Sequence, residues 1–246
     1  MTNNTSTPEH SESTETAISY STCYEKPFRV LNLYACLGGN RLLWENCEVT
    51  AVELDPELAR MYQERFPNDK VIVTDAHQYL LDHYKEFDFI WSSPPCPSHS
   101  RARYWSSSNY DTTTEAIYPD MKLYQEVLFL QHYYRTGKFV VENVIPYYEP
   151  LIPAKKRGRH LYWTNFNLPS DLNDRLVQIG AGKNELNKLC EFHKIDISTY
   201  KGEQSMIKVA RNLVDYEAGK TIFNTARGIF EKSKVNQVSM FGDAVL

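Results

Sequence analysis

The sequence lacks the features of secreted, membrane-spanning and zinc-binding proteins. Its five cysteines form no Cys-x-x-Cys pair and show no Cys/His spacing typical of a zinc site. We therefore expect free thiols, no metal site and an intracellular protein. No apolar run approaches the length of a membrane span, and the N-terminus has no hydrophobic signal core. These absences predict a soluble protein without membrane contact.

The chain also lacks an excess of positive charge, since 27 lysines and arginines stand against 31 acidic residues. The acidic excess is concentrated in residues 1–26, which are rich in Ser, Thr, Asn and Glu and are predicted to be a disordered tail. A basic segment, Lys-Lys-Arg-Gly-Arg-His at 155–160, lies further on. Local patches determine contact with phosphates, so the net charge of −4 does not exclude a nucleic-acid partner.

Short apolar strands alternate with helices in the first two thirds of the chain. Strands are predicted at residues 29–34, 49–54, 71–74, 87–92, 138–141 and 161–166. Helices are predicted at about residues 41–46, 56–66, 76–85 and 121–134, the second capped by Asp55 with Pro56 at its first position. The alternation predicts an α/β fold with a doubly wound, mostly parallel sheet. A length of 246 residues suits one such domain with a small appendage.

The most informative stretch is residues 89–100, where an apolar run stops at two prolines and a cysteine follows. Proline cannot donate to a strand ladder, so the strand ends at Ser92 or Ser93. Cys96 then lies just past the carboxyl end of a strand, where open α/β sheets bind their ligands. An isolated cysteine in such a place is more often a small buried side chain.

Other strand ends carry glycines or acids. The Gly38-Gly39 turn, Glu53 and Asp75 follow three successive predicted strands. Glycines let the backbone approach a ligand, and an acid about 14 residues later can bind ribose hydroxyls, so the pattern favours a nucleoside ligand. Residues 97–118 are predicted to form a long loop, whose Arg, Tyr, Trp, Ser and Asn residues suit contacts with phosphates and bases.

Together these pieces resemble the DNA (cytosine-5)-methyltransferase family. The matching segments are Tyr34-Ala35-Cys36-Leu37-Gly38-Gly39 with the family's Phe-x-Gly-x-Gly-Gly, Pro95-Cys96 with its catalytic Pro-Cys, Glu142-Asn143-Val144 with its Glu-Asn-Val, Arg157-Gly158-Arg159 with its Arg-x-Arg, and Phe241-Gly242-Asp243-Ala244-Val245 with its closing Gly-Asn-x-Val. Cys36 stands where the family has a glycine, and Asp243 where it has asparagine.

The resemblance implies a Rossmann-like class I methyltransferase fold with S-adenosyl-L-methionine as cofactor. It assigns to the cofactor Tyr34, Ala35, Cys36, Leu37, Gly38, Gly39, Glu53, Leu54, Asp75, Ala76, Pro95, Asp243, Ala244 and Val245. It assigns to catalysis Cys96, Glu142, Arg157 and Arg159, and to the substrate Pro94, Ser100, Arg101, Arg103, Asn143 and Val144.

The resemblance also divides the chain and suggests its setting. A tail at 1–26 precedes a catalytic and cofactor-binding domain at 27–167, a short target-recognition insert at 168–205 and a segment at 206–246 that returns to the domain. The expected partner is double-stranded DNA, read by a monomer without an obligate protein partner. The expected place is the cytoplasm of a bacterial or phage-infected cell.

The chemistry explains why these residue types are needed. Carbon 5 of cytosine becomes nucleophilic when a thiolate adds to carbon 6, and cysteine suits this because its thiol ionises near neutral pH and is intrinsically nucleophilic. Glu142 lies at the tip of the strand predicted to neighbour the strand before Cys96, and it is expected to hold a proton at ring nitrogen 3. Arg157 or Arg159 is expected to stabilise the carbonyl at position 2. The base must leave its duplex, and the 97–118 loop is expected to close over it with Arg101 and Arg103 on phosphates.

Three alternatives stay open at this point. An amino-methyltransferase would carry an aromatic residue after Ser93-Pro94-Pro95, where this chain has Cys96. The same carbon-5 chemistry on RNA is a second alternative, and a non-catalytic protein that binds DNA or the cofactor is a third.

Overall fold

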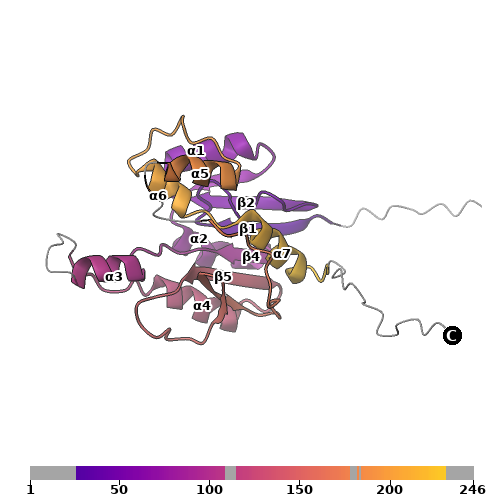
Figure 1. Cartoon of the computed structure of the whole chain (residues 1–246). Coiled ribbons are helices and arrows are strands. Elements are labelled where there is room, and N and C mark those ends of the chain that lie inside the picture. The colour runs from indigo at the N-terminus through magenta and orange to yellow at the C-terminus, as the bar shows by residue number, and fades with distance from the viewer. Residues whose placement is uncertain (1–25, 109–114, 178–181, 183, 231–246) are drawn as a thin grey trace, which may run out of the picture.

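The computed structural model describes residues 26–108, 115–177, 182 and 184–230, which form a sheet with helices on both faces (Figure 1). The seven strands lie in the order β3-β2-β1-β4-β5-β7-β6. The parallel strands are β1 (Phe28–Leu33), β2 (Cys47–Glu53), β3 (Lys70–Val73), β4 (Phe89–Ser92) and β5 (Lys138–Val144). The antiparallel edge strands are β6 (Lys155–Arg157) and β7 (His160–Thr164). This topology confirms the predicted doubly wound, mostly parallel sheet.

Seven α-helices are described, and they cover both faces of the sheet. They are α1 (Pro56–Arg65), α2 (Ala76–His83, followed by a 3-10 turn at Tyr84–Glu86), α3 (Arg101–Ser108), α4 (Lys122–Tyr133), α5 (Glu185–His193), α6 (Met206–Arg211) and α7 (Tyr216–Ala226). In the described residues no helix is both apolar and long enough to cross a bilayer.

The central strands are buried on both faces, which explains their continuous apolar sequences. On one face, Val30, Phe89 and Val140 pack with Ile222 and Phe223 of α7. The other face is covered by α2 and α4, whose side chains pack against Leu31, Leu33, Ile90, Phe139 and Val141. A smaller cluster joins α1 to α5, α6 and the segments beside them, which lie on one side of the sheet in Figure 1.

Two helices begin where the sequence predicts, because an aspartate caps each one. Asp55 accepts hydrogen bonds from the backbone N–H groups of Glu57 (2.9 Å) and Leu58 (3.4 Å), and Pro56 is the first helical residue. Asp75 accepts one from the backbone N–H of Gln78 at 2.9 Å. Since each cap directly follows a strand, it also fixes where the chain leaves the sheet.

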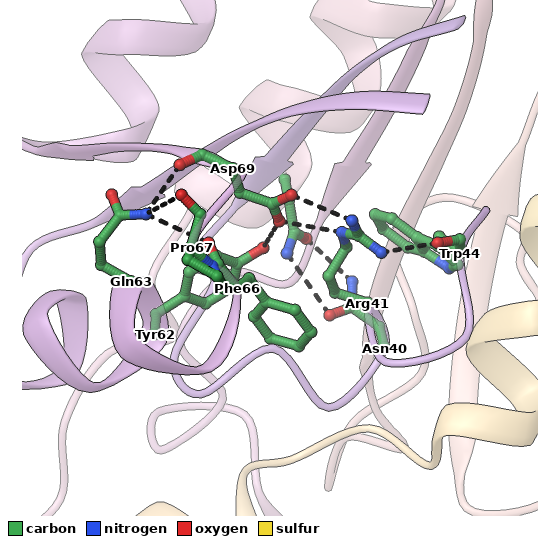
Figure 2. A network of polar contacts seen from close by, with 9 residues as sticks. Asn40, Arg41, Trp44, Tyr62, Gln63, Phe66, Pro67 and Asp69 are labelled. Carbon is green, nitrogen blue, oxygen red and sulfur yellow. Dashed lines mark hydrogen bonds and ion pairs between the residues drawn. The ribbon is translucent and has the colours of Figure 1, made fainter. Parts of the chain in front are cut away.

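The helix predicted at residues 41–46 is wrong, because this segment forms successive turns. The Arg41 side chain binds both carboxylate oxygens of Asp69 (2.9 and 3.0 Å) and the carbonyl of Trp44 (2.7 Å), as Figure 2 shows. Asp69 also accepts a hydrogen bond from the hydroxyl of Tyr62. These long-range contacts outweigh the weak helical tendency of a six-residue segment.

Two further segments differ from their prediction. Residues 97–118 are not a continuous loop, because they contain α3, which projects from the body of the molecule (Figure 1). The Ser100 hydroxyl accepts a hydrogen bond from the backbone N–H of Ala102, at the start of that helix. Residues 168–205 likewise contain α5, which the sequence analysis left unassigned. Both helices are short, with eight and nine residues, so they give little periodic signal.

Candidate active site

A cavity of about 1060 Å³ opens at the carboxyl ends of the parallel strands. It brings together twelve residues that the sequence analysis assigned to the site: Tyr34, Cys36, Glu53, Leu54, Asp75, Ala76, Pro94, Pro95, Cys96, Glu142, Asn143 and Val144. Ligand pockets for drug-sized molecules commonly measure about 300–1,000 Å³. This cavity therefore has room for a nucleoside cofactor together with a second group.

Glu53, at the end of β2, is one of the acids from the strand ends that line the cavity. Its carboxylate accepts hydrogen bonds from the backbone N–H groups of Cys36 (2.7 Å) and Asp55 (3.0 Å). Burial raises the pKa of this carboxyl group, and the backbone hydrogen bonds oppose the rise. A carboxylate has about four lone-pair directions, so Glu53 can still accept hydrogen bonds from ribose hydroxyls.

Asp75 lies at the end of β3 on the same cavity wall. The hydrogen bond from the Gln78 N–H is the main reason that the pKa of Asp75 is lowered, so this acid is held as a carboxylate. Lys122 Nζ lies 3.4 Å from its other oxygen. The pair of acids at the ends of β2 and β3 fits the donors of a nucleoside.

The backbone between Tyr34 and Gly39 turns tightly beside Glu53. Tyr34 and Cys36 have φ angles of 57° and 48°, a left-handed conformation that favours glycine. Cys36 thus keeps the backbone shape expected of the glycine it replaces, at the cost of local strain. Burial raises the pKa of its thiol to about 12, so Cys36 is a neutral side chain.

Cys96 follows β4 on a loop that neighbouring residues hold in place. The side-chain amide of Asn143 donates to the carbonyl of Pro94 at 2.9 Å, and the Cys96 carbonyl accepts from the backbone N–H groups of His99 and Ser100. Burial, followed by the negative charge of Glu142, raises the pKa of the Cys96 thiol to about 11. The positive charge of Lys208 opposes this rise. The free protein therefore holds Cys96 mainly as a thiol at neutral pH.

Glu142 lies within β5, next to the strand that leads to Cys96. The parallel register pairs Ser92 with Val141, which confirms the predicted neighbourhood of the two strands. Glu142 is only 6% exposed, and its Oε1 lies 3.5 Å from Nε2 of His160 on β7. A thiol, a carboxyl group and an imidazole thus meet at one end of the cavity.

The two arginines of the predicted Arg-x-Arg do not line this cavity. Arg157 donates from its guanidinium to the main-chain carbonyls of Lys156, Leu168 and Pro169. Arg159 lines a separate cavity of about 60 Å³. The sequence motif is present, but its two guanidinium groups lie elsewhere in this structure.

Other predicted residues surround the cavity without lining it. Arg101 donates to the carbonyl of Pro146 (3.1 Å), and Arg103 to that of Glu115 (3.0 Å). Ser100 forms an isolated bridge with Pro146, which joins the Cys96 loop to the loop after β5. Four residues of the predicted cofactor loop do not line the cavity either: Ala35, Leu37, Gly38 and Gly39. Asp243, Ala244 and Val245 lie outside the described residues.

The second half of the chain contributes cavity-lining residues that no sequence motif had predicted. Lys208 of α6, His160 and the segment 212–214 line the cavity. A methyl group added at Gly39 would lie 2.5 Å from the carbonyl of Val214, so this glycine lets the segment approach the cofactor loop. The sequence did contain a signal for residues 212–214, because Asn212-Leu213-Val214 has the Asn-x-Val spacing of the family's closing Gly-Asn-x-Val motif.

Comparison with known proteins identifies the first half of the chain. A model of the family described as C-5 cytosine-specific DNA methylase matches residues 28–146, which include Cys96 and Glu142. No curated protein matches the chain. The match implies S-adenosyl-L-methionine as the cofactor.

Several solved structures are similar to the chain. A mutant of DNMT2 from Spodoptera frugiperda is 21% identical over 48% of this chain and 35% of its own, with a TM-score of 0.35. The methyltransferase EhMeth from Entamoeba histolytica is 11% identical over 85% of this chain and 100% of its own, with a TM-score of 0.49. A SAM-dependent methyltransferase from Agrobacterium tumefaciens is 16% identical over 51% and 41%, with a TM-score of 0.35.

This chain spans 35% of the length of that DNMT2 chain. The sheet order, the cavity at the strand ends and the family match agree with one another. Residues 28–146 match the C-5 cytosine-specific DNA methylase family and contain the five parallel strands of a Rossmann-like sheet.

Proposed function

We propose that this protein methylates carbon 5 of cytosine in double-stranded DNA through a covalent adduct with Cys96. The observation that carries the proposal is the shared cavity: Cys96 and Glu142 lie at the ends of adjacent parallel strands, in one cavity with Glu53 and Asp75. Such an arrangement places a nucleophile and a proton carrier beside a nucleoside cofactor.

The cofactor half of the cavity fits S-adenosyl-L-methionine. Glu53 is the acceptor for the ribose hydroxyls, and Asp75 for an amino group of the adenine. Residues 212–214 line the cavity next to Gly39, and we assign to them the part that the resemblance gave to Asp243, Ala244 and Val245. When bound, the cofactor supplies an electrophilic methyl group on a sulfonium centre.

Cys96 needs activation before it can attack. With a pKa of about 11, only about one thiol in ten thousand is ionised at pH 7. Glu142 both raises this pKa and lies in the same cavity, so it is suited to take the proton as the substrate binds. The thiolate then becomes abundant only when a cytosine is present.

The covalent step balances with these two residues. Glu142 takes the Cys96 proton and passes it to ring nitrogen 3 while the sulfur bonds to carbon 6. The electrons of the carbon 5–carbon 6 double bond move to form a double bond between carbons 4 and 5, which makes carbon 5 nucleophilic. After carbon 5 has received the methyl group, water removes its proton. The bond between sulfur and carbon 6 then breaks, ring nitrogen 3 gives its proton back to Glu142, and Glu142 returns it to the thiolate of Cys96.

Lys208 is suited to the role that the sequence analysis gave to Arg157 or Arg159. Arg60, Lys122 and Arg211, the other cavity-lining lysines and arginines, are each ion-paired with a carboxylate. Lys208 has no such partner among the described residues, and its charge acts on Cys96. A cation here stabilises both the thiolate and the charge that develops on the cytosine carbonyl.

The proposed substrate is a cytosine flipped out of duplex DNA. On the segment that follows Cys96, Tyr104 of α3 stacks on Tyr147 of the loop after β5, with ring centroids 4.8 Å apart. With Arg101 and Arg103 on the projecting α3, this surface suits contact with bases and phosphates (Figure 1). We assign target recognition to residues 168–205, which follow the strands that frame the site.

The test is methyl transfer from radiolabelled cofactor to unmethylated genomic DNA and to total RNA, followed by mass spectrometry of the nucleosides. We expect 5-methylcytosine in DNA, its loss in Cys96→Ser, and full activity in Cys47→Ser, because Cys47 does not line the cavity. Product in RNA alone would refute the DNA assignment, and N4-methylcytosine would refute the carbon-5 chemistry. No product from any substrate would favour a non-catalytic binding protein.

A further inference from the structure

A buried carboxylate lies directly behind the cofactor cavity. Glu126 of α4 is 1% exposed and accepts three side-chain hydrogen bonds. The donors are the hydroxyl of Tyr34 (2.5 Å), the hydroxyl of Ser92 (2.5 Å) and Nδ1 of His77 (2.9 Å). Burying a carboxylate is costly unless it is fully hydrogen-bonded, so these three contacts are what makes the position stable.

The three donors belong to three elements that wall the cavity. Tyr34 follows β1 and lines the cavity itself, and Ser92 ends β4 immediately before the lining residues Ser93 and Pro94. His77 lies in the first turn of α2, next to another lining residue, Ala76. Glu126 therefore connects the ends of two strands and the start of a helix at one point.

The contact with Tyr34 is a departure from the family pattern. The family's opening motif has phenylalanine where this chain has Tyr34. The hydroxyl that donates a hydrogen bond to Glu126 is therefore absent from the family's motif. Tyr34 also has a φ angle of 57°, which a residue with a side chain adopts only when its surroundings hold it there. The short hydrogen bond to Glu126 is such a restraint.

His77 makes the cluster sensitive to pH. The hydrogen bond with Glu126 is the main cause that raises the pKa of His77. Asp75 acts in the same direction, whereas burial and the charge of Lys122 act against it. As the pH rises through this raised pKa, the imidazolium loses its proton and the ion pair with Glu126 weakens.

We propose that Glu126 is a positioning residue that holds the wall of the cofactor cavity in its binding shape by acting through Tyr34 and His77. It does not line the cavity, so it does not touch the cofactor. The role rests on the proposed use of this cavity for S-adenosyl-L-methionine and goes beyond the residues that contact it.

The experiment measures binding of S-adenosylhomocysteine by calorimetry, with the melting temperature recorded for every variant. Glu126→Gln keeps the size of the side chain but removes its charge, and Tyr34→Phe removes only the hydroxyl. We expect Glu126→Gln to weaken binding about tenfold, because hydrogen bonds to a charged acceptor are stronger than those to a neutral amide. The variant with both Glu126→Gln and Tyr34→Phe should bind no more weakly than Glu126→Gln alone. The reason is that both substitutions remove the same hydrogen bond between Tyr34 and Glu126.

A matched control is available in an exposed pair of the same chemistry. His83 Nδ1 contacts Glu86 Oε1 at 2.7 Å on the surface, so Glu86→Gln removes the same kind of contact away from the cavity and should leave binding unchanged. A pH series adds a second readout. The affinity of the unmodified protein should fall as the pH rises through the pKa of His77. The affinity of His77→Gln should stay the same over this pH range.

Two results would overturn the inference. If Glu126→Gln lowered the melting temperature but left the dissociation constant and its pH profile unchanged, Glu126 would only support the fold. If the double variant lost affinity additively, Glu126 would not act through Tyr34. Failure of the unmodified protein to bind S-adenosylhomocysteine would refute the proposed function itself, and this role with it.

Discussion

Replacing Glu142 by glutamine tests the electrostatic link between Glu142 and Cys96, the two side chains proposed to carry the reaction. The negative charge of Glu142 is the second cause, after burial, of the raised pKa of Cys96. Glutamine has nearly the same shape but no charge, so it removes this cause and leaves the burial in place. The variant should therefore have a more reactive thiol and yet no methyl transfer, because it has no proton to give to the ring.

The magnitude follows from the pKa of the thiol. With a pKa of about 11, about one thiol in a thousand is ionised at pH 8. Loss of a nearby like charge lowers a pKa by roughly one unit or more, and one unit multiplies the thiolate fraction by about ten. The Cys96 thiol of Glu142→Gln should thus react with iodoacetamide about tenfold faster at pH 8.

The assay is timed alkylation with quenching and mass spectrometry of the peptide that contains Cys96. Cys36, whose pKa is about 12, is an internal reference in the same cavity. Glu142→Asp keeps the charge and should react at nearly the unmodified rate, whereas Lys208→Gln should react more slowly. Equal or slower alkylation in Glu142→Gln would refute the electrostatic reasoning.

Two further substitutions test the two halves of the site. Glu53→Ala removes the proposed ribose acceptor and should weaken cofactor binding, measured by calorimetry, about tenfold or more. Its circular dichroism spectrum should be unchanged. An unchanged affinity would place the cofactor elsewhere. Asn143→Ala removes the hydrogen bond to the Pro94 carbonyl and should slow transfer on the order of tenfold, at constant cofactor affinity, by loosening the loop that carries Cys96. A slowed rate that is restored by more cofactor would contradict this role.

Local patterns were enough to predict the sheet and the two central residues. The apolar run before Pro94 marks β4, and the same kind of run marks β5, so the sequence alone places Cys96 and Glu142 at neighbouring strand ends. Asp55 and Asp75 each follow a strand and cap a helix, so their helix starts were predictable too. These features depend on a few adjacent residues.

Features that depend on distant contacts were not predictable in this way. The segment after β1 forms turns because Arg41 binds Asp69, which is far away in the sequence. The guanidinium of Arg157 donates to the carbonyls of residues 168 and 169. The Arg-x-Arg motif alone does not predict where this side chain points. Lys208 reaches the cavity only because α6 packs beside α1, which no local pattern shows.

The most direct measurement of the central claim is the mass of the Cys96 peptide after incubation with the cofactor and DNA in which 5-fluorocytosine replaces cytosine. In ordinary cytosine a base removes a proton from carbon 5, but 5-fluorocytosine has fluorine at that position. The reaction should therefore stop with the sulfur still bonded to carbon 6. The proposed mechanism predicts a peptide that carries a methylated fluoropyrimidine on Cys96. A protein that methylates ordinary DNA but leaves Cys96 unmodified in this experiment would contradict it.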